Sequence, residues 1–339
     1  MIKNIILRDF RNYNNEERVF KEGLNIIIGV NGRGKTNLLE AIFFLLQGRS
    51  MRTNDVKEMI RKGSDEALVE GRFEIDGERK ERVVVNREEG TRRGRRIDYL
   101  EAVSFQPDDM WMIKKGPEAR RGALDEIIKG VKRGYAATTQ EYQRILRQRN
   151  EAIKAVRKGA KEREYMRSWN QLLYQKGREI TQEREGMLRK VEAEMARAAQ
   201  RWGAEEVSLR YYSSMRGKSE EEAREKILRM EEAEIRRGIT LIGPHRDEIL
   251  FLAGGRNARR ECSQGEQKIL MIMWRLAQAR LAMEDGGKQA LLLMDDCLSE
   301  LDEGNKEKTI KELERWGQAL VTVTEDNSRF KGYWKVNLD

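Results

Sequence analysis

A glycine-rich loop stands between an apolar run and an apolar helical pattern. Its residues are Gly29, Val30, Asn31, Gly32, Arg33, Gly34, Lys35 and Thr36. This spacing fits the P-loop pattern, in which backbone N–H groups and a helix start surround the phosphates of a nucleotide. We expect Lys35 to add positive charge beside the outer phosphates and Thr36 to offer its hydroxyl to Mg²⁺. The loop therefore predicts a site for ATP and Mg²⁺, although a plain glycine-rich turn is the structural alternative.

Two adjacent acids end a second apolar run. Residues 291–294 are Leu, Leu, Leu and Met, and Asp295 and Asp296 follow directly. An apolar strand that ends in carboxylates is the arrangement of a Walker B element. We expect Asp295 to hold Mg²⁺, directly or through water, and Asp296 to polarise the attacking water. A strand leaving the core would look the same, but beside a P-loop the sequence predicts catalytic roles for Lys35, Asp295 and Asp296.

A third segment, residues 263–267, reads Ser-Gln-Gly-Glu-Gln and opens an apolar helical pattern. Ser263 is a candidate helix N-cap, which would be a purely structural role. A serine and a glycine at a helix N-terminus can also receive a phosphate. Ser263, Gly265 and Gln267 are therefore candidate nucleotide contacts.

These segments need an α/β framework to position them. We expect strands at 2–7 and 24–28, a helix at 36–46, and an antiparallel flap over one sheet edge around the Asp76-Gly77 turn. The α/β pattern returns late in the chain, with a helix at 264–283 and strands at 291–294 and 320–323. Together they predict a split nucleotide-binding domain, residues 1–125 and 239–339.

Residues 126–238 differ in composition from both flanks. They are proline-free and rich in Arg, Glu and Lys, with an apolar stripe at helical spacing. Trp202-Gly203 and Arg237-Gly238 are candidate helix stops, and residues 207–211 alternate as a short strand does. We interpret this stretch as a mainly helical arm domain inserted into the split domain.

The overall composition favours a polyanionic partner. The 339 residues carry 67 Lys+Arg against 58 Asp+Glu, a formal net charge of +9. DNA fits this balance, although many basic proteins bind none. Cys262 and Cys297 are far apart, so the sequence predicts neither a disulfide framework nor a zinc site. No run is long enough for a signal peptide or a membrane span, so we expect a cytoplasmic protein.

Two arginine clusters are candidate DNA contacts. The flap carries the densest one, Arg92, Arg93, Arg95 and Arg96, and the arm carries Arg144, Arg147 and Arg149. Such runs are usually just solvated surface. We recognise no base-reading motif, so any contact should be to the DNA backbone and should weaken steeply with salt.

Taken together, the motifs resemble the RecF family of ABC-type ATPases. The resemblance lies in residues 48–50 (Gly-Arg-Ser), 243–247 (Gly-Pro-His-Arg-Asp), 263–267, 295–296 and 299–302 (Ser-Glu-Leu-Asp), and less sharply in 142–150. It implies an ABC-type ATPase head in which residues 263–267 bind the γ-phosphate of ATP held by the opposite subunit and residues 299–302 form the D-loop. It also implies slow ATP hydrolysis, an ATP-dependent homodimer on double-stranded DNA at gaps or junctions, and action with RecO and RecR in loading recombinase during recombinational repair.

The resemblance suggests three further residues. Gln106 would be the Q-loop glutamine that senses Mg²⁺ and water, with an exposed polar residue before a proline as the equal alternative. Arg11 would reach the nucleotide, with an ordinary surface arginine as its alternative. His245, the only histidine, lies away from the switch position of ABC-type ATPases, so we expect it to be structural. Residues 321–326 occupy that position, and a threonine there is the expected substitute.

Other classes of protein remain as alternatives. A P-loop kinase acting on a small molecule would need neither the segment at 263–267 nor the arm. A transporter ATPase subunit would normally lack so long a helical insertion. A double-strand-break ATPase with a zinc hook would need cysteine in the arm, and residues 126–238 contain none. Another SMC-like ATPase is a further alternative.

Overall fold

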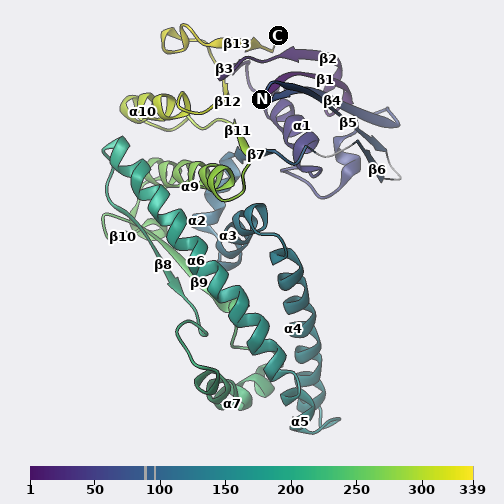
Figure 1. Cartoon of the computed structure of the whole chain (residues 1–339), viewed down its shortest axis with the longest axis vertical. Coiled ribbons are helices and arrows are strands. Elements are labelled where there is room, and N and C mark those ends of the chain that lie inside the picture. Colours follow the sequence, from purple (N-terminus) through teal and green to yellow (C-terminus); the bar gives the residue numbers. More distant parts are fainter. Residues whose placement is uncertain (88–89, 95–96, 339) are drawn as a thin grey trace. The chain divides into compact units, whose positions relative to one another are not determined.

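The computed structural model describes residues 1–87, 90–94 and 97–338. These fall into two compact units, residues 1–110 with 263–339, and residues 111–262 (Figure 1). The second unit includes more residues at both ends than the predicted arm, 126–238. It includes them because α3 (Pro117–Val131) packs against α6 (Asn170–Trp202), and because β9 (Glu248–Ala253) pairs with β8 (Val207–Tyr212).

The first unit contains a parallel sheet of the order β13-β3-β12-β11-β7. Its strands are β3 (Gly23–Ile28), β7 (Leu100–Phe105), β11 (Gln289–Met294), β12 (Gln318–Val323) and β13 (Trp334–Asn337). Each strand except β13 is mostly buried, as expected for parallel strands covered on both faces. Because β3, β7, β11 and β12 run parallel, their carboxyl ends lie at one edge of the sheet, where the following loops can meet.

An antiparallel sheet of the order β2-β1-β4-β5-β6 forms the predicted flap. Its strands are β1 (Ile2–Phe10), β2 (Tyr13–Val19), β4 (Glu66–Ile75), β5 (Glu78–Arg87) and β6 (Gly90–Arg93). Asp76 and Gly77 join β4 to β5 with positive φ, as a two-residue hairpin requires. We expected the flap over one edge of the parallel sheet, whereas it is a separate sheet that packs on α1 (Lys35–Gln47), as Figure 1 shows.

Helix α1 is the centre of the first unit. All nine residues from Leu38 to Leu46 are buried, because the helix contacts strands of both sheets. A helix that buries residues on all of its faces is stable only in such a position. The other helices of this unit are α9 (Gln264–Glu284) and α10 (Glu303–Leu313), with short 3₁₀ turns at Val56–Met59, Pro107–Met110 and Ser328–Phe330. Helix α9 packs on β7 and β11.

The second unit is mainly helical, with α6 as its spine. Besides α3, α6 and the strands named above, it contains α2 (Trp111–Lys114), α4 (Tyr135–Arg157), α5 (Arg163–Arg167), α7 (Glu220–Arg237), α8 (Ala258–Glu261), β10 (Arg256–Asn257) and a 3₁₀ turn at Pro244–Arg246. Helix α6 contacts α3, α4, α7 and β8. Helix α6 ends before Gly203 and α7 ends before Gly238, and both glycines have the left-handed backbone conformation. The two predicted helix stops are therefore confirmed. Within the described residues, no helix has the length and apolar character needed to cross a membrane.

Candidate nucleotide site

The P-loop follows β3 and leads directly into α1. Gly32 and Gly34 have φ of 88° and 100°, which other residues rarely adopt. A Cβ on Gly34 would also lie 2.6 Å from the amide nitrogen of Asn12. The side chain of Asn12 in turn donates to the carbonyl of Arg33 at 3.3 Å, and Tyr13 donates to that of Gly34 at 3.0 Å. The flap therefore supports the loop from behind, while residues 30–33 are exposed.

Lys35 lies across the loop that it follows. Its ammonium donates to the carbonyl of Gly29 and, at 3.2 Å, to that of Val30. These neutral acceptors satisfy the donors only in part, so the charge remains available to a phosphate. The loop, its exposed backbone and Lys35 together offer the groups that an anion receptor of the predicted kind needs.

Asp295 joins the P-loop to the end of the parallel sheet. Its Oδ2 accepts from the hydroxyl of Thr36 at 2.7 Å, and its Oδ1 accepts from that of Thr322 at 2.8 Å. Its backbone N–H bonds to the carbonyl of Phe105, which fixes it beside β7. Thr36 and Asp295, predicted from segments 259 residues apart, are thus in direct contact.

This pair fits a magnesium site of the kind that nucleotides complete. Mg²⁺ is usually held by one or two protein oxygens together with substrate phosphates, not by a cage of protein ligands. A hydroxyl and a buried carboxylate beside a phosphate receptor are such a set. Accordingly, among the residues that the structure describes, no cluster of three or more His, Cys, Asp or Glu could hold a metal by itself.

Asp296 lies beyond Asp295 with φ of 48°, a strained conformation for a non-glycine residue. Its N–H donates to the hydroxyl oxygen of Thr322 at 2.8 Å. Its carboxylate accepts from the hydroxyl of Ser299 at 2.8 Å. Thr322 therefore positions both acids, a role that the sequence analysis did not assign to this residue. The signal was present, because Thr322 is one of two polar residues in the buried strand β12.

Gln106 follows β7 in the register position next to Asp295. It is 9% exposed, and its side-chain amide nitrogen is buried without a hydrogen-bond partner. Its backbone N–H bonds to Asp109, whose carboxylate is paired with Arg275 at 2.6 Å. An unpartnered buried amide is costly, so it marks a position where a ligand or water would bind. The interpretation as an exposed polar residue does not hold.

Residues 263–267, here called the signature segment, form the N-cap and first turn of α9. Ser263 caps the helix, accepting from the N–H of Glu266 at 3.3 Å while the Glu266 carboxylate accepts from the N–H of Ser263 at 2.7 Å. The structural role of Ser263 is therefore confirmed, and the residue is exposed. Gly265 is half-buried beside the carbonyl of Glu300, whereas Gln267 is buried beneath the surface. Of the three candidates, Ser263 and Gly265 remain accessible to a phosphate.

Arg11 contacts the P-loop helix. Its guanidinium binds both carboxylate oxygens of Glu40, at 2.8 and 2.9 Å, and Glu40 is completely buried in α1. Ser50 and Arg52 complete the surroundings of that carboxylate. In this structure, Arg11 thus neutralises a buried charge and is not an ordinary surface arginine.

The candidate DNA contacts divide by exposure. Arg92 and Arg93 are exposed on β6, an edge strand of the flap. Arg144 and Arg147 are exposed on α4. Arg95 and Arg96 lie outside the described residues.

Arg149, which the sequence analysis grouped with the arm contacts, is completely buried, so that prediction is wrong. Its guanidinium pairs with Glu234 at 2.7 Å and also binds Asn170 and Thr240. Two-residue spacing on a helix points side chains in different directions, so a cluster in sequence need not share a face.

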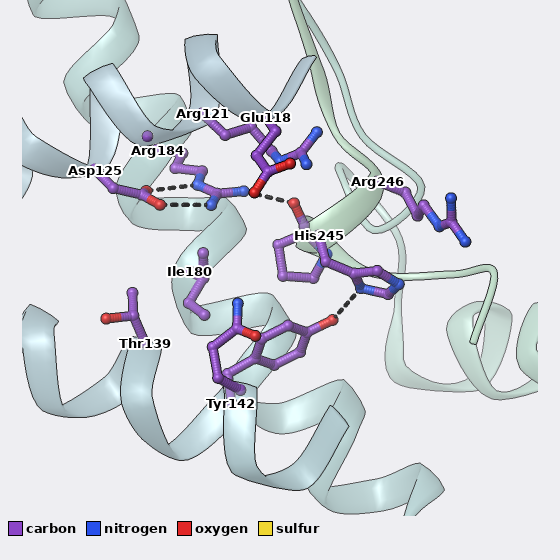
Figure 2. A pocket seen from close by; sticks show the side chains of 12 residues that line it. Glu118, Arg121, Asp125, Thr139, Tyr142, Ile180, Arg184, His245 and Arg246 are labelled. Atoms are coloured by element: carbon purple, nitrogen blue, oxygen red, sulfur yellow. Dashed lines mark hydrogen bonds and ion pairs between the residues drawn. The ribbon is translucent and has the colours of Figure 1, made fainter. Parts of the chain in front are cut away.

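His245 lines a pocket of about 520 Å³ within the second unit, and Figure 2 shows it facing Tyr142. Its Nε2 lies 3.1 Å from the carbonyl of Thr240 and must donate to it. Its Nδ1 therefore accepts from the hydroxyl of Tyr142, at 2.7 Å. Burial lowers the pKa of His245 to about 4. A neutral imidazole with both nitrogens bonded supports the expected structural role.

Comparisons with known proteins agree with this geometry. A family model described as the RecF/RecN/SMC N terminal domain matches residues 1–331. The DNA replication and repair protein RecF of Bacillus subtilis (strain 168) is 32% identical, over 95% of this chain and 93% of that protein. The chain belongs to the RecF family. A RecF from Moorella thermoacetica is 34% identical, over 96% of this chain and 90% of its own length.

Solved structures give the same result. A structure described as the recombination mediator protein RecF-ATPrS in the RecFOR pathway has a TM-score of 0.84 and 26% identity, over 99% of this chain and 95% of that one. The Smc head domain of Pyrococcus furiosus, at a TM-score of 0.53 and 18% identity over 96% and 90%, shares the fold. The predicted fold is confirmed, and this RecF-family chain is an ABC-type ATPase.

Proposed function

We propose that this RecF-family ATPase binds ATP with Mg²⁺ at the P-loop, closes as a homodimer around two composite sites, and so clamps double-stranded DNA. The observation that carries the proposal is that the candidate phosphate-binding residues fall into two separate groups. Thr36 and Asp295 are joined in one chain, while the hydrogen bonds of the exposed Ser263 to other described residues lie within its own helix start. A signature turn left open in this way fits a phosphate brought by a second copy.

The residues have separable roles in hydrolysis. The loop N–H groups and Lys35 bind the phosphate oxygens, and Ser263 and Gly265 of the second copy bind the γ-phosphate. Bound Mg²⁺ would add charge neutralisation, held by Thr36 and Asp295 with Gln106 nearby. Asp296 accepts a proton as water attacks the γ-phosphorus and the bond to the β–γ bridging oxygen breaks, giving ADP and phosphate. Loss of the γ-phosphate removes the interaction that holds the dimer closed.

ATP acts as a ligand with higher affinity for the closed state, so its binding drives closure. We infer that the exposed arginines of β6 and α4 contact the DNA backbone, because no base-reading element is recognisable. The description of two similar structures as recombination mediators of the RecFOR pathway supports a role in recombination, with RecR and RecO as partners. Gap or junction DNA as the preferred substrate is part of the same proposal. Loading of recombinase would follow from that assembly. A P-loop kinase is disfavoured, since it needs neither the signature turn nor the arm.

Sedimentation with ADP or ATP, with and without short duplex DNA, tests the proposal. We expect ATP alone to produce dimers and salt-sensitive DNA binding, and Lys35→Met and Ser263→Arg to abolish both. Ser219→Arg is the matched control, because Ser219 caps α7 with the same capping box as Ser263 but outside the signature turn. A protein that stays monomeric with ATP and ignores DNA would contradict the clamp and favour the kinase.

A further inference from the structure

Lys268 is a charged residue in the interior of the first unit. It lies on α9, directly after residues 263–267, and is 3% exposed. Its helical neighbours Ile269, Leu270 and Met271 are buried apolar residues. Burial lowers the pKa of this ammonium. A charge in such surroundings is tolerated only where fixed acceptors replace its water.

The acceptors all belong to the segment that carries the catalytic acid. The Nζ of Lys268 lies 2.9 Å from the carbonyl oxygen of Asp296, 2.8 Å from that of Ser299, and 2.7 Å from the hydroxyl oxygen of Ser299. An ammonium has three N–H donors, so all three have acceptors. The Ser299 hydroxyl in turn binds the Asp296 carboxylate. One side chain thus connects the start of α9 to the water-polarising residue and the D-loop.

The two connected segments serve different nucleotides in the proposed dimer. Asp296 acts on the ATP bound by its own chain, whereas Ser263 contacts the ATP of the second copy. If the signature turn moved and the D-loop did not, the buried ammonium of Lys268 would lose its hydrogen-bond acceptors. The two segments are therefore expected to move together. Gly265 lies beside the same segment, since a Cβ there would meet the carbonyl oxygen of Glu300 at 3.6 Å, an ordinary van der Waals distance.

We propose that Lys268 is a positioning residue that couples the two ATP sites, so that γ-phosphate binding at one chain's signature turn sets the position of Asp296 for that chain's own ATP. This inference rests on the proposed composite-site dimer. It predicts that the two sites hydrolyse ATP together. It also gives a reason why a lysine is buried on a helix face that is otherwise apolar.

The test compares Lys268→Met, which keeps the length and removes the charge, with Lys268→Arg, which keeps donors. Lys308→Met, at an exposed lysine of α10, is the control. The measurements are ATP affinity, kcat, and the Hill coefficient of hydrolysis against ATP concentration. We expect wild type and the control to show a Hill coefficient above about 1, and Lys268→Met to fall to about 1 with kcat reduced about tenfold and ATP affinity unchanged. Lys268→Arg should restore part of the cooperativity.

A merely structural lysine would lower thermal stability and leave the Hill coefficient unchanged, which would overturn the inference. So would a non-cooperative wild type that nevertheless dimerises with ATP. If the wild type does not dimerise, the proposed function itself fails, and sedimentation separates that result from the others. Should Lys268→Met not fold, Ser299→Ala removes one acceptor, and we expect a smaller loss of cooperativity in the same direction. Unchanged cooperativity in Ser299→Ala would then overturn the inference.

Discussion

At the scale of single residues, the site depends on hydroxyl groups as much as on its charges. Asp295 receives one hydroxyl from Thr36 and one from Thr322, and the latter oxygen also accepts the N–H of Asp296. Fixed donors of this kind hold a carboxylate in a single orientation before substrate arrives. Thr322 is therefore the threonine with which the chain orients both acids.

Thr322→Val removes this shared hydroxyl without changing the shape of the side chain. We expect kcat for ATP hydrolysis to fall about 10- to 100-fold, because a hydrogen bond to a charged group is worth about 1.5–3 kcal/mol. ATP affinity should change little, since the P-loop is untouched. Steady-state hydrolysis and nucleotide titration measure the two effects. The exposed Thr324 provides the control, and equal losses in Thr322→Val and Thr324→Val would contradict the assignment.

We expect His245 to make the stability of the second unit depend on pH. Its folded pKa of about 4 lies below the ordinary value of 6.5, so the unfolded chain binds more protons between these values. The stabilisation is complete above pH 6.5 and is lost as pH falls from 6.5 toward 4. Asp247, whose pKa is raised mainly by burial, acts in the opposite direction in acid.

We expect His245→Gln to lose this component, which is about 3 kcal/mol at most. The difference in unfolding free energy between wild type and variant, measured by urea denaturation from pH 4 to 7.5, isolates the histidine because Asp247 is present in both. A difference that does not depend on pH would contradict the assignment.

At the scale of elements, a buried ion pair joins the helices of the second unit. Arg149 of α4 and Glu234 of α7 are both 0% exposed, and Thr240 and Asn170 satisfy further donors of the guanidinium. Glu234 also accepts the N–H of Leu241, so it fixes the chain that leaves α7. A pair of this kind is costly to break from one side only, because the remaining charge stays buried.

Arg149→Met should therefore lower the free energy of unfolding by about 3–5 kcal/mol, and Arg149→Met with Glu234→Gln should recover part of it. Denaturant titration measures both. Arg147→Met, two residues away on the exposed face, is the matched control and should change stability by less than about 0.5 kcal/mol. A double variant less stable than Arg149→Met would show that the loss is one of packing and not of charge.

At the scale of the whole molecule, binding to DNA should be electrostatic. The exposed arginines of α4 and β6 offer charge without a base-reading element, so counterion release should dominate affinity. Each unit carries one exposed cluster, Arg92 and Arg93 in the first and Arg144 and Arg147 in the second. Contacts in both units would make the clamp depend on the entire chain.

Arg144→Gln with Arg147→Gln should weaken binding to duplexes of any sequence. The slope of log K against log salt concentration should also become shallower, by about 0.9 for each phosphate that the variant no longer neutralises. Fluorescence anisotropy at several salt concentrations measures both, with ATP hydrolysis as a check that the site is intact. An unchanged slope would place the DNA contacts elsewhere.

Much of the site was determined by the sequence. Local patterns sufficed for the P-loop, the paired acids, the capped signature and the hairpin at Asp76-Gly77, because each is specified by neighbours along the chain. The helix stops at Gly203 and Gly238 were predictable for the same reason, since a left-handed C-terminal residue favours glycine.

Tertiary structure alone decided which residues from distant segments contact one another. It brought Thr322 to Asp295, Lys268 to Ser299 and Arg11 to Glu40, and it buried Arg149 while leaving Arg147 exposed. These outcomes depend on strand order and on which helix face meets the core, and neither is encoded in local spacing. Thr322, a polar residue within the apolar run of β12, was a sign in the sequence that a distant partner existed. The identity of that partner required the fold.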